Sequence, residues 1–388
     1  MSRIGAGLST EQDTVFAARD AARQAGAGLA DGVDLAFVFL SPAHRSEAAE
    51  AADVVREELT PRNLLGCTAQ GIVARDREIE EGSAVAVWAG SLPGAEIETF
   101  HADVVEEDGE AALTGFPSLE GPDLVALFAD PFTFPVGGLL EALNEQAPDT
   151  PLVGGIAVAG EEAGSAGLIL DGDVHESGAV GAVVAGVPVK AVVSQGCAPI
   201  GRDAVITRAE ENVVFELAGR PALVRLHEEL AGLSEETQLQ AAKGLLAGLV
   251  IDENLPEHGR GDFLVRGILG VDERTGALAL ADHVRVGQTL RFHVRDAKAA
   301  DEDLREALAR ELGSSSAVGA LLFTCNGRGR HMFSEAHHDA RAVSQALGAD
   351  ALAGFFCGGE IGPVGGRSFL HGFTATLAVF LAEETGEP

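Results

Sequence analysis

Apolar runs of strand length recur along this chain, and segments with a helical pattern separate them. The first run, "DLAFVFL" (34–40), is continuous and short, which predicts a strand buried on both faces. The amphipathic segment "HRSEAAEAADVVREEL" (44–59) predicts a helix. Two further runs, "LLGCTAQGIV" (64–73) and "SAVAVWAG" (83–90), predict a strand with a glycine-flanked turn and a second strand. The order is therefore strand, helix, strand with a glycine turn, and strand.

The same order occurs twice more. Strands are predicted at 123–130, 151–158, 178–186, 317–325, 351–362 and 369–381, with helices at 136–146 and 335–347. The chain therefore contains three similar units, at 34–90, 123–186 and 318–381. We predict an α/β fold with mixed, largely antiparallel sheets, layered helices and internal duplication of this strand-helix-strand-strand unit.

The remaining segments have the same α/β character. Helices are predicted at 12–29, 220–230, 235–249 and 299–312, and strands at 187–196, 203–209, 262–272, 276–282 and 288–296. Ser9 or Thr10 is the expected N-cap of the first helix. A helix with Pro221 in its first turn begins after Gly219, so we expect two regions, residues 1–219 and 220–388.

Composition limits the partners and the compartment. The 388 residues carry a net charge of −33, from 60 acidic and 27 basic residues, and this field repels nucleic acid. The N-terminus has no apolar targeting segment, and no apolar run is long enough to span a membrane. The four cysteines form no CxxC pair, which favours reduced thiols. We therefore expect a cytoplasmic protein that binds neither nucleic acid nor membrane.

Several catalytic signatures are absent, and glycine-flanked polar turns stand out in their place. The sequence has no GxxxxGK[ST], GxSxG or HExxH motif. Four turns join glycine to polar residues: "GCTAQG" (66–71), "SQGCAPIGR" (194–202), "TCNGRGR" (324–330) and "CGGEIGP" (357–363). Free backbone N–H groups in such turns attract anionic groups, and an arginine can grip a carboxylate. These turns predict a small-ligand pocket rather than an active site.

The candidate ligand residues follow from these turns. They are Gly66, Cys67, Thr68, Cys325, Asn326, Arg328, Gly358, Gly359, Glu360 and His371. In this hypothesis Arg328 and backbone N–H groups hold a carboxylate, and Glu360 faces an amine. Alternatively, Glu360 only closes a turn by accepting bonds from backbone N–H groups.

Two other chemistries remain open at this point. Cys325 or Cys357 could act as a nucleophile with His371, or with His331, His337 or His338, as its base. Haem needs an axial ligand in an apolar cavity, and His293 and His371 alternate with apolar residues. The "HHD" run at 337–339 lies at a helix start, where we expect surface residues.

Taken in order, these segments resemble a known family. "GAGLSTEQD", "LLGCTAQG", "PLVGGIAV", "VVSQGCAPIG" and "VITRAEENVVFELAGRPAL" are similar to the N-terminal region of FIST (F-box and intracellular signal transduction) proteins. "GDFLVRGILGVD", "LLFTCNGRG", "GFFCGGEIGPVGG" and "FLHGFTATLAVF" are similar to the C-terminal FIST region. The resemblance covers nearly the whole chain.

The resemblance implies a sensory module for small ligands such as amino acids. It also implies an alternative, a haem-based nitric-oxide sensor working beside a histidine kinase, although no haem-ligand motif can be placed here. Eukaryotic relatives carry an F-box. Because the two regions fill this chain, we expect no F-box, kinase or receptor domain, no catalytic activity of its own, and a separate signalling partner.

Overall fold

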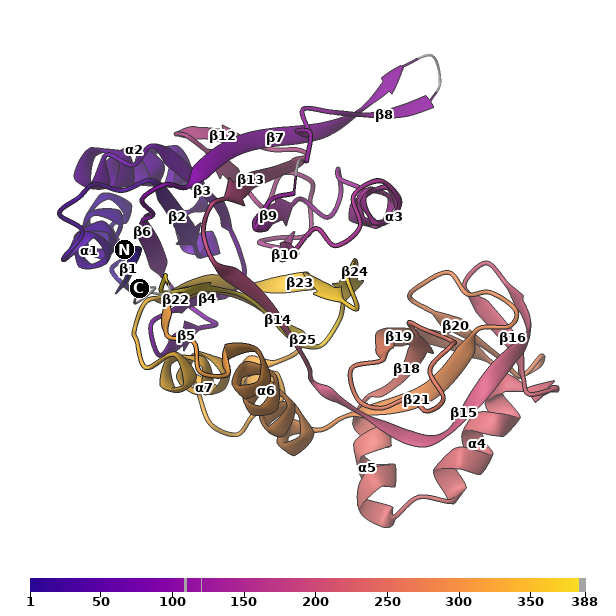
Figure 1. Cartoon of the computed structure of the whole chain (residues 1–388). Helices are drawn as coiled ribbons and strands as arrows, with labels where there is room; N and C mark the ends of the chain where they lie inside the picture. Colours follow the sequence, from indigo (N-terminus) through magenta and orange to yellow (C-terminus); the bar gives the residue numbers. More distant parts are fainter. Residues whose placement is uncertain (108–109, 120, 384–388) are drawn as a thin grey trace, which may run out of the picture. The chain divides into compact units, whose positions relative to one another are not determined.

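The chain forms two compact units. The computed structural model describes residues 1–107, 110–119 and 121–383 (Figure 1). The larger unit contains residues 1–193, 304–370 and 374–388 within these described ranges, and the smaller unit contains residues 194–303 and 371–373. The boundary expected at Gly219 lies inside the smaller unit, so the compact units do not follow the two sequence regions.

The larger unit contains two mixed β-sheets. The first has six described strands, in the order β1 (Arg3–Ser9), β6 (Val85–Ser91), β2 (Leu35–Leu40), β3 (Asn63–Thr68), β11 (Leu168–Leu170) and β12 (Asp173–His175). The second has twelve, beginning with β14 (Val189–Gln195), β25 (Thr374–Leu381), β22 (Ala317–Cys325), β23 (Leu352–Val364), β10 (Leu152–Ala157), β9 (Leu124–Ala129), β13 (Ala179–Ala185), β7 (Glu96–Glu107) and β8 (Glu110–Thr114). Its remaining strands, β24 (Arg367–His371), β4 (Ile72–Ala74) and β5 (Arg77–Ile79), attach through β23.

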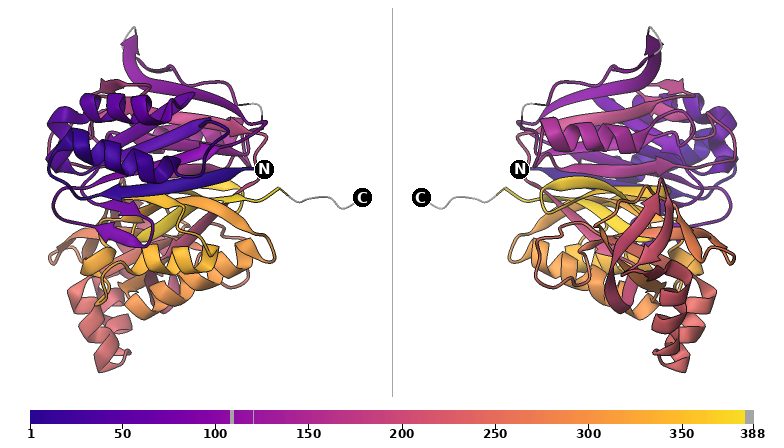
Figure 2. Two further views of the ribbon diagram at one scale, coloured as in Figure 1. Left: turned by 90° about the vertical axis from the view of Figure 1, so that its left-hand side faces the viewer. Right: turned by 90° about the vertical axis from the view of Figure 1, so that its right-hand side faces the viewer.

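Helices cover the sheets of this unit. Helices α1 (Thr14–Gly26) and α2 (Ala48–Leu59) cover one face of the six-stranded sheet (Figures 1 and 2). The sides of both helices that pack on the sheet are rich in alanine. The C-terminal part of α6 (Ala297–Leu312) and α7 (His338–Leu347) pack on β22, β23 and β25. Helix α3 (Val136–Gln146) packs beside β9 and β10. The predicted layered α/β architecture is therefore confirmed.

The predicted threefold unit is present in the strand pairing. In repeat 1, β2 runs parallel to β3 and antiparallel to β6. In repeat 2, β9 has the same relation to β10 and β13, and in repeat 3, β22 has it to β23 and β25. In each repeat the segment of chain that connects the two parallel strands contains a helix, as a parallel connection usually does.

One glycine occupies the same position in all three repeats. Gly66 pairs with Val38, Gly154 with Leu127, and Gly354 with Leu322. A Cβ atom at each glycine would collide with the carbonyl oxygen of that paired residue. The glycines that recur in the sequence therefore allow the two parallel strands to approach closely.

The residue after each of these pairing positions is a phenylalanine on the inner face. The rings of Phe39 and Phe128 have centroids 5.6 Å apart, and those of Phe128 and Phe323 are 5.5 Å apart. All three rings contact Phe355, with centroid distances of 5.4, 5.4 and 5.3 Å. Such aromatic pairs each contribute about 0.5–1.5 kcal/mol beyond their buried area. One aromatic cluster therefore joins the three repeats.

The smaller unit is a barrel. Its strands follow the order β15 (Cys197–Glu210), β21 (Thr289–Arg295), β18 (Leu245–Val250), β19 (Phe263–Asp272), β20 (Ala277–Leu280), β16 (Val213–Leu217) and β17 (Arg220–Pro221). A further β15–β16 pairing closes six of these strands into a ring. Helices α4 (Ala222–Ala231) and α5 (Glu235–Lys243) accompany it, and the interior holds Ile206, Leu249, Leu278 and Phe292.

Three local predictions were wrong. The N-cap of α1 is Asp13, whose side chain accepts from Phe16 N, whereas Ser9 belongs to strand β1. The helix expected at 235–249 ends at Lys243, because residues 245–250 pair with β19 and β21 instead. The single strand expected at 369–381 is broken between His371 and Thr374 into β24 and β25.

Among the described residues, no helix has both the length and the apolar character that crossing a membrane requires.

The glycine of repeat 3 gives a test of the strand packing. We expect Gly354→Ala to lower the free energy of unfolding by about 2–3 kcal/mol, because the added methyl group collides with backbone that cannot move alone. Fluorescence of Trp88, the single tryptophan and fully buried in the larger unit, follows the urea transition. As control, Gly138→Ala in α3, where a Cβ meets open space, should stabilise by up to about 1 kcal/mol. Equal effects of the two changes would contradict this account.

Candidate functional site

The candidate site lies at the carboxyl ends of β22 and β23, the parallel strands of repeat 3. Ligands of α/β sheets commonly bind at this edge. β22 ends at Cys325 and is followed by Asn326, Gly327 and Arg328. Glu360 lies farther along β23. The turn predicted at 324–330 does follow the end of β22, but residues 357–363 belong to strand β23, so the turn predicted there was wrong.

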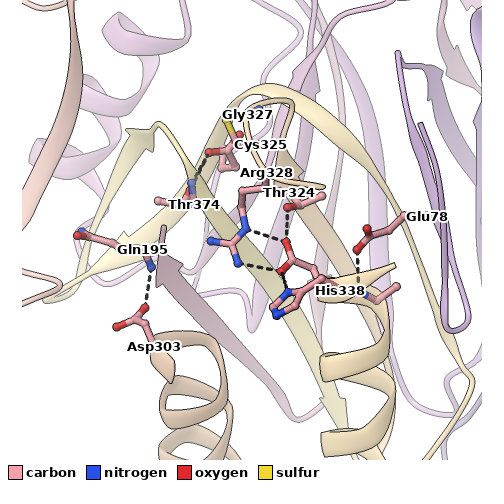
Figure 3. A network of polar contacts seen from close by, with 12 residues as sticks. Glu78, Gln195, Asp303, Thr324, Cys325, Gly327, Arg328, His338 and Thr374 are labelled. Atoms are coloured by element: carbon pink, nitrogen blue, oxygen red, sulfur yellow. Dashed lines mark hydrogen bonds and ion pairs between the residues drawn. The ribbon is translucent and has the colours of Figure 1, made fainter. Parts of the chain in front are cut away.

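Arg328 forms a buried ion pair with Asp339 of α7 (Figure 3). Nε donates to Asp339 Oδ2 at 2.7 Å, and Nη2 donates to Oδ1 at 2.8 Å. The Arg328 side chain is 0% exposed and that of Asp339 is 1% exposed, so water does not screen the pair. Burial alone would raise the pKa of Asp339, but the charge and hydrogen bonds of Arg328 hold it well below its ordinary value.

Neighbouring side chains fix this pair in place. Thr324 Oγ1 donates to Asp339 Oδ2 at 2.8 Å, and His338 Nδ1 donates to Oδ1 at 3.0 Å (Figure 3). The ring of Phe333 stacks on His338 with centroids 3.5 Å apart, and the guanidinium of Arg328 lies 5.3 Å from the same ring. Asp339 therefore accepts bonds on both oxygens, and two of the three guanidinium nitrogens of Arg328 are committed.

Glu360 is the second buried charge-bearing group of the site. Its Oε2 accepts from Thr374 N at 3.1 Å and from Thr374 Oγ1 at 2.8 Å. Burial raises the pKa of Glu360 to about 8, against the opposing effects of the Thr374 bonds, the Cys325 thiol and the Arg328 charge. At neutral pH this carboxyl group is therefore mostly protonated.

The bond to Thr374 has a counterpart in the other repeats. Ala84, Gly178 and Thr374 occupy equivalent positions just before or at the start of the third strand of each repeat. Each lies three residues before the third-strand residue that pairs with the central strand opposite the recurring glycine. The N–H of Ala84 donates to Ser41 Oγ at 2.9 Å, and that of Gly178 donates to Thr133 Oγ1 at 2.9 Å. Glu360 Oε2 thus accepts the backbone N–H near the start of the third strand, which hydroxyl groups accept in repeats 1 and 2.

One polar atom of Arg328 and one of Glu360 have no hydrogen-bond partner in the described structure. Arg328 Nη1 and Glu360 Oε1 are both buried without a hydrogen bond. The two groups lie close enough for each charge to shift the pKa of the other. Buried polar groups nearly always have partners, since each one left without costs about 1–3 kcal/mol. Arg328 Nη1 is therefore an uncommitted donor, and Glu360 Oε1 is an uncommitted acceptor when the carboxyl group is ionised.

Three of the cysteines and Glu360 lie near one another. Cys325 and Cys357 are register partners on β22 and β23, and charges at Cys325, Cys67 and Glu360 affect Cys357. Burial raises the pKa of both Cys67 and Cys357 well above the ordinary value. These two thiols are therefore poor nucleophiles, which argues against Cys357 as a catalytic residue.

The remaining predicted residues have mostly packing roles. A Cβ at Gly358 would collide with Val158, and one at Gly359 with Leu370. Thr68 is buried at the end of β3, where its N–H donates to Ala166 O at 2.6 Å, and Gly66 makes the close strand contact described above. Asn326 is partly buried, and its N–H donates to Cys357 O at 2.9 Å. His371 is buried at the end of β24.

Sequence reasoning missed Asp339, Thr374 and Glu78. The expectation that 337–339 is surface was wrong for Asp339, because α7 begins at His338 and turns Asp339 toward Arg328. The spacing of Asp339 from the apolar residues Ala342 and Val343, on one helical face, was the available signal.

Glu78 of β5 fastens the loop that carries these residues. Glu78 Oε1 accepts from Ala340 N at 2.9 Å, and Glu78 N donates to His337 Nδ1 at 3.0 Å. Burial, together with the charge of Asp339, raises the pKa of Glu78 to about 7. Glu80 accepts from Arg330 N through both oxygens at 3.1 Å. Two acids from repeat 1 therefore hold the loop of repeat 3.

The haem alternative gains no support from the histidine that best matches its requirement. His293 is fully buried, and its Nδ1 donates to Arg291 O at 3.0 Å. However, Phe263 packs against its ring at 4.9 Å, and a Cβ at Gly248 would collide with the imidazole. A ring so tightly enclosed does not fit an axial ligand, which needs one open side for the macrocycle.

A surface groove of about 480 Å³ lies elsewhere on the larger unit. It is lined by β1, the end of α1, Arg75 and residues 349–351, and by none of the predicted ligand residues. Its polar side chains are already paired. Arg75 pairs with Asp350 at 3.3 Å, and the Gln24 amide bonds the backbone N–H and the carbonyl oxygen of Leu8. We therefore place the candidate site at Arg328 and Glu360 rather than in this groove.

The three repeats define an α/β protein with buried ionisable side chains at the strand ends of repeat 3, and comparison with known proteins gives its family. Residues 34–220 match the FIST N domain, and residues 222–363 match the FIST C domain. The chain therefore belongs to the FIST family, whose domains are signal-transduction sensory domains. It is similar to an uncharacterized protein of Mycobacterium tuberculosis (strain CDC 1551 / Oshkosh), at 46% identity over 98% of this chain and 100% of the relative. An uncharacterized protein of Mycobacterium bovis is 45% identical over 98% of this chain and 99% of its own.

The buried ion pair gives a stability test. We expect Asp339→Ala to lower the free energy of unfolding by about 3–5 kcal/mol, because it leaves the Arg328 charge buried without a partner. The matched change Asp350→Ala breaks the exposed pair with Arg75 and should cost less than about 1 kcal/mol. Urea unfolding followed by Trp88 fluorescence compares them. A small loss for Asp339→Ala would mean that Arg328 reaches water or another anion.

The two raised acid pKa values predict how stability depends on pH. Glu78 and Glu360 titrate with pKa values of about 7 and about 8 in the folded protein, against 4.5 as their ordinary value. From about pH 4.5 to about 8 the folded state binds more protons than the unfolded chain, so the free energy of unfolding falls as pH rises. Unfolding curves from about pH 5 to about pH 9 measure this slope. Glu360→Gln should flatten its upper part, and an unchanged slope in that variant would rule out Glu360 as the source.

Proposed function

We propose that this protein senses a small polar ligand, of the amino-acid class, at Arg328 and Glu360. The observation that carries the proposal is the pair of unpartnered buried atoms, Arg328 Nη1 and Glu360 Oε1. A ligand with an anionic group and an amine satisfies both at once. The anionic group accepts from Nη1, and the amine donates to Oε1.

The geometry narrows the contacts of such a ligand. Arg328 offers it one nitrogen rather than a two-pronged grip, because Asp339 occupies Nε and Nη2. Glu360 offers one oxygen, because Thr374 occupies the other. The ligand is therefore small, and each of its charged ends has one strong contact with a side chain.

The other repeats support a specific role for repeat 3. At the position of Arg328, repeats 1 and 2 have His44 and Thr133, and at the position of Glu360 they have Ile72 and Gly160. Thr133 bonds within its own loop, to Asp130 Oδ1 at 2.9 Å. An acid and a base together occur in repeat 3 alone, although all three repeats share one backbone plan.

We further propose that the protein acts in the cytoplasm and signals through a separate partner chain, such as a histidine kinase. All four cysteines are buried and lie outside any disulfide, which fits a reducing compartment. The excess of acidic residues argues for a partner surface that is basic.

Calorimetry against a panel of amino acids tests the ligand proposal. We expect one ligand class to bind, and Glu360→Gln to weaken it by about tenfold to a hundredfold through loss of a charge-assisted bond. Because a cationic amine favours ionised Glu360, binding at about pH 7 should release about one proton per ligand, seen as a heat that changes with the buffer. The Gln variant should release none.

Controls separate this site from the groove and from misfolding. Asp350→Asn alters the groove and should leave binding unchanged. Unfolding curves of Glu360→Gln verify that the variant is folded. Binding that survives Glu360→Gln but is lost in Asp350→Asn would overturn the proposed site.

A further inference from the structure

Cys325 differs from the other three cysteines in its surroundings. It is 9% exposed, whereas Cys67, Cys197 and Cys357 are at most 1% exposed. Its Sγ accepts from Gly327 N at 3.4 Å, a bond that stabilises a thiolate. It ends β22, at the edge of the sheet where Arg328 and Glu360 lie.

Two charged groups flank this thiol. The Cys325 thiol acts to lower the pKa of Glu360, and its charge also acts on Arg328, so the thiol lies near both groups. Arg328 favours the thiolate by charge, and Glu360 is a base whose buried oxygen Oε1 has no hydrogen bond of its own. The sequence suggested histidine as the base for a reactive cysteine, but the structure places a glutamate beside Cys325.

The equivalent positions in the other repeats show what is new here. Cys325 lies three residues after the central-strand residue that pairs with the recurring glycine. The residues at this position are Ser41 in repeat 1 and Asp130 in repeat 2. Ser41 Oγ accepts from Ala84 N at 2.9 Å, and Asp130 Oδ1 accepts from Phe132 N at 3.0 Å. An oxygen acceptor is enough for this place in the fold. The sulfur of repeat 3 adds reactivity that the fold does not require.

We propose that Cys325 is a modification site, oxidised by hydrogen peroxide or a small organic hydroperoxide to a sulfenic acid, with Glu360 as the group that moves the proton. This inference does not rest on the proposed ligand, because the reaction needs only the thiol, the carboxyl group and the peroxide.

The oxidation conserves atoms and electrons. Ionised Glu360 takes the proton of the Cys325 thiol, and the sulfur electron pair attacks one peroxide oxygen. The O–O bond breaks, and the leaving hydroxide or alkoxide takes the proton back from Glu360. Sulfur is oxidised, the peroxide is reduced, and the products are the sulfenic acid and water or an alcohol.

The groups around Glu360 set its pH dependence. Arg328 and Cys325 come from β22 and the turn after it, Cys357 from β23, and Thr374 from β25. Glu360 has a pKa of about 8, so the oxidation rate should rise as pH passes through that value.

The full-length protein is treated with hydrogen peroxide and dimedone, and peptide mass spectrometry reports which cysteine carries the adduct. We expect the adduct at Cys325 in the folded protein, none there in Cys325→Ser, and an unchanged rate in Cys357→Ser. Serine is the residue of repeat 1 at this position, so Cys325→Ser should fold. Glu360→Gln should slow the reaction by about a hundredfold and remove the rise near about pH 8.

Two results would overturn the proposal. One is labelling of all four cysteines alike, or labelling only after urea unfolds the chain. The other is a Cys325 oxidation rate and pH profile that are the same in the wild-type protein and in Glu360→Gln, when Trp88 fluorescence shows that both are folded.

Discussion

The packing of three equivalent phenylalanine rings is the contact on which the larger unit depends. Phe39, Phe128 and Phe323 each come from the central strand of one repeat, and all of them meet Phe355. The contact is only reached because a glycine in each repeat lets the parallel strands approach. The repeated sequence pattern therefore gives a repeated backbone. As a result, the ends of the central strands have equivalent backbone positions in the three repeats.

A second constraint explains why repeat 3 carries the chemistry. The N–H that begins the third strand of every repeat is away from water and needs an acceptor. Ser41 and Thr133 supply neutral hydroxyl oxygens, whereas repeat 3 uses Glu360. A carboxyl group has a second oxygen, and that oxygen is left buried beside Arg328 and Cys325. The bond from Thr374 thus holds Glu360 in a buried place, where its second oxygen without a hydrogen bond costs free energy.

Ligand sensing and thiol oxidation, as proposed, meet at this one carboxyl group. Both require the ionised carboxylate, which can receive an amine or take the proton of a thiol. Asp339 cannot replace it, because Arg328, Thr324 and His338 already bond both of its oxygens. Glu78 and Glu80 of repeat 1 bond the backbone at Ala340 and Arg330, and because the pKa of Glu78 is raised, pH acts on this support as well as on the site.

The sequence by itself determined the α/β class, the threefold order of strands and helices, the FIST family and the unusual position of Glu360. These follow from local patterns, because hydrophobic period and turn residues act within a few positions of the chain. Tertiary structure decided the rest. It made 245–250 a strand, because pairing with β19 and β21 outweighs helical preference, and it buried Asp339 against Arg328. It also brought Glu78 to α7 from 262 positions away, where only folding, not spacing, makes two residues neighbours.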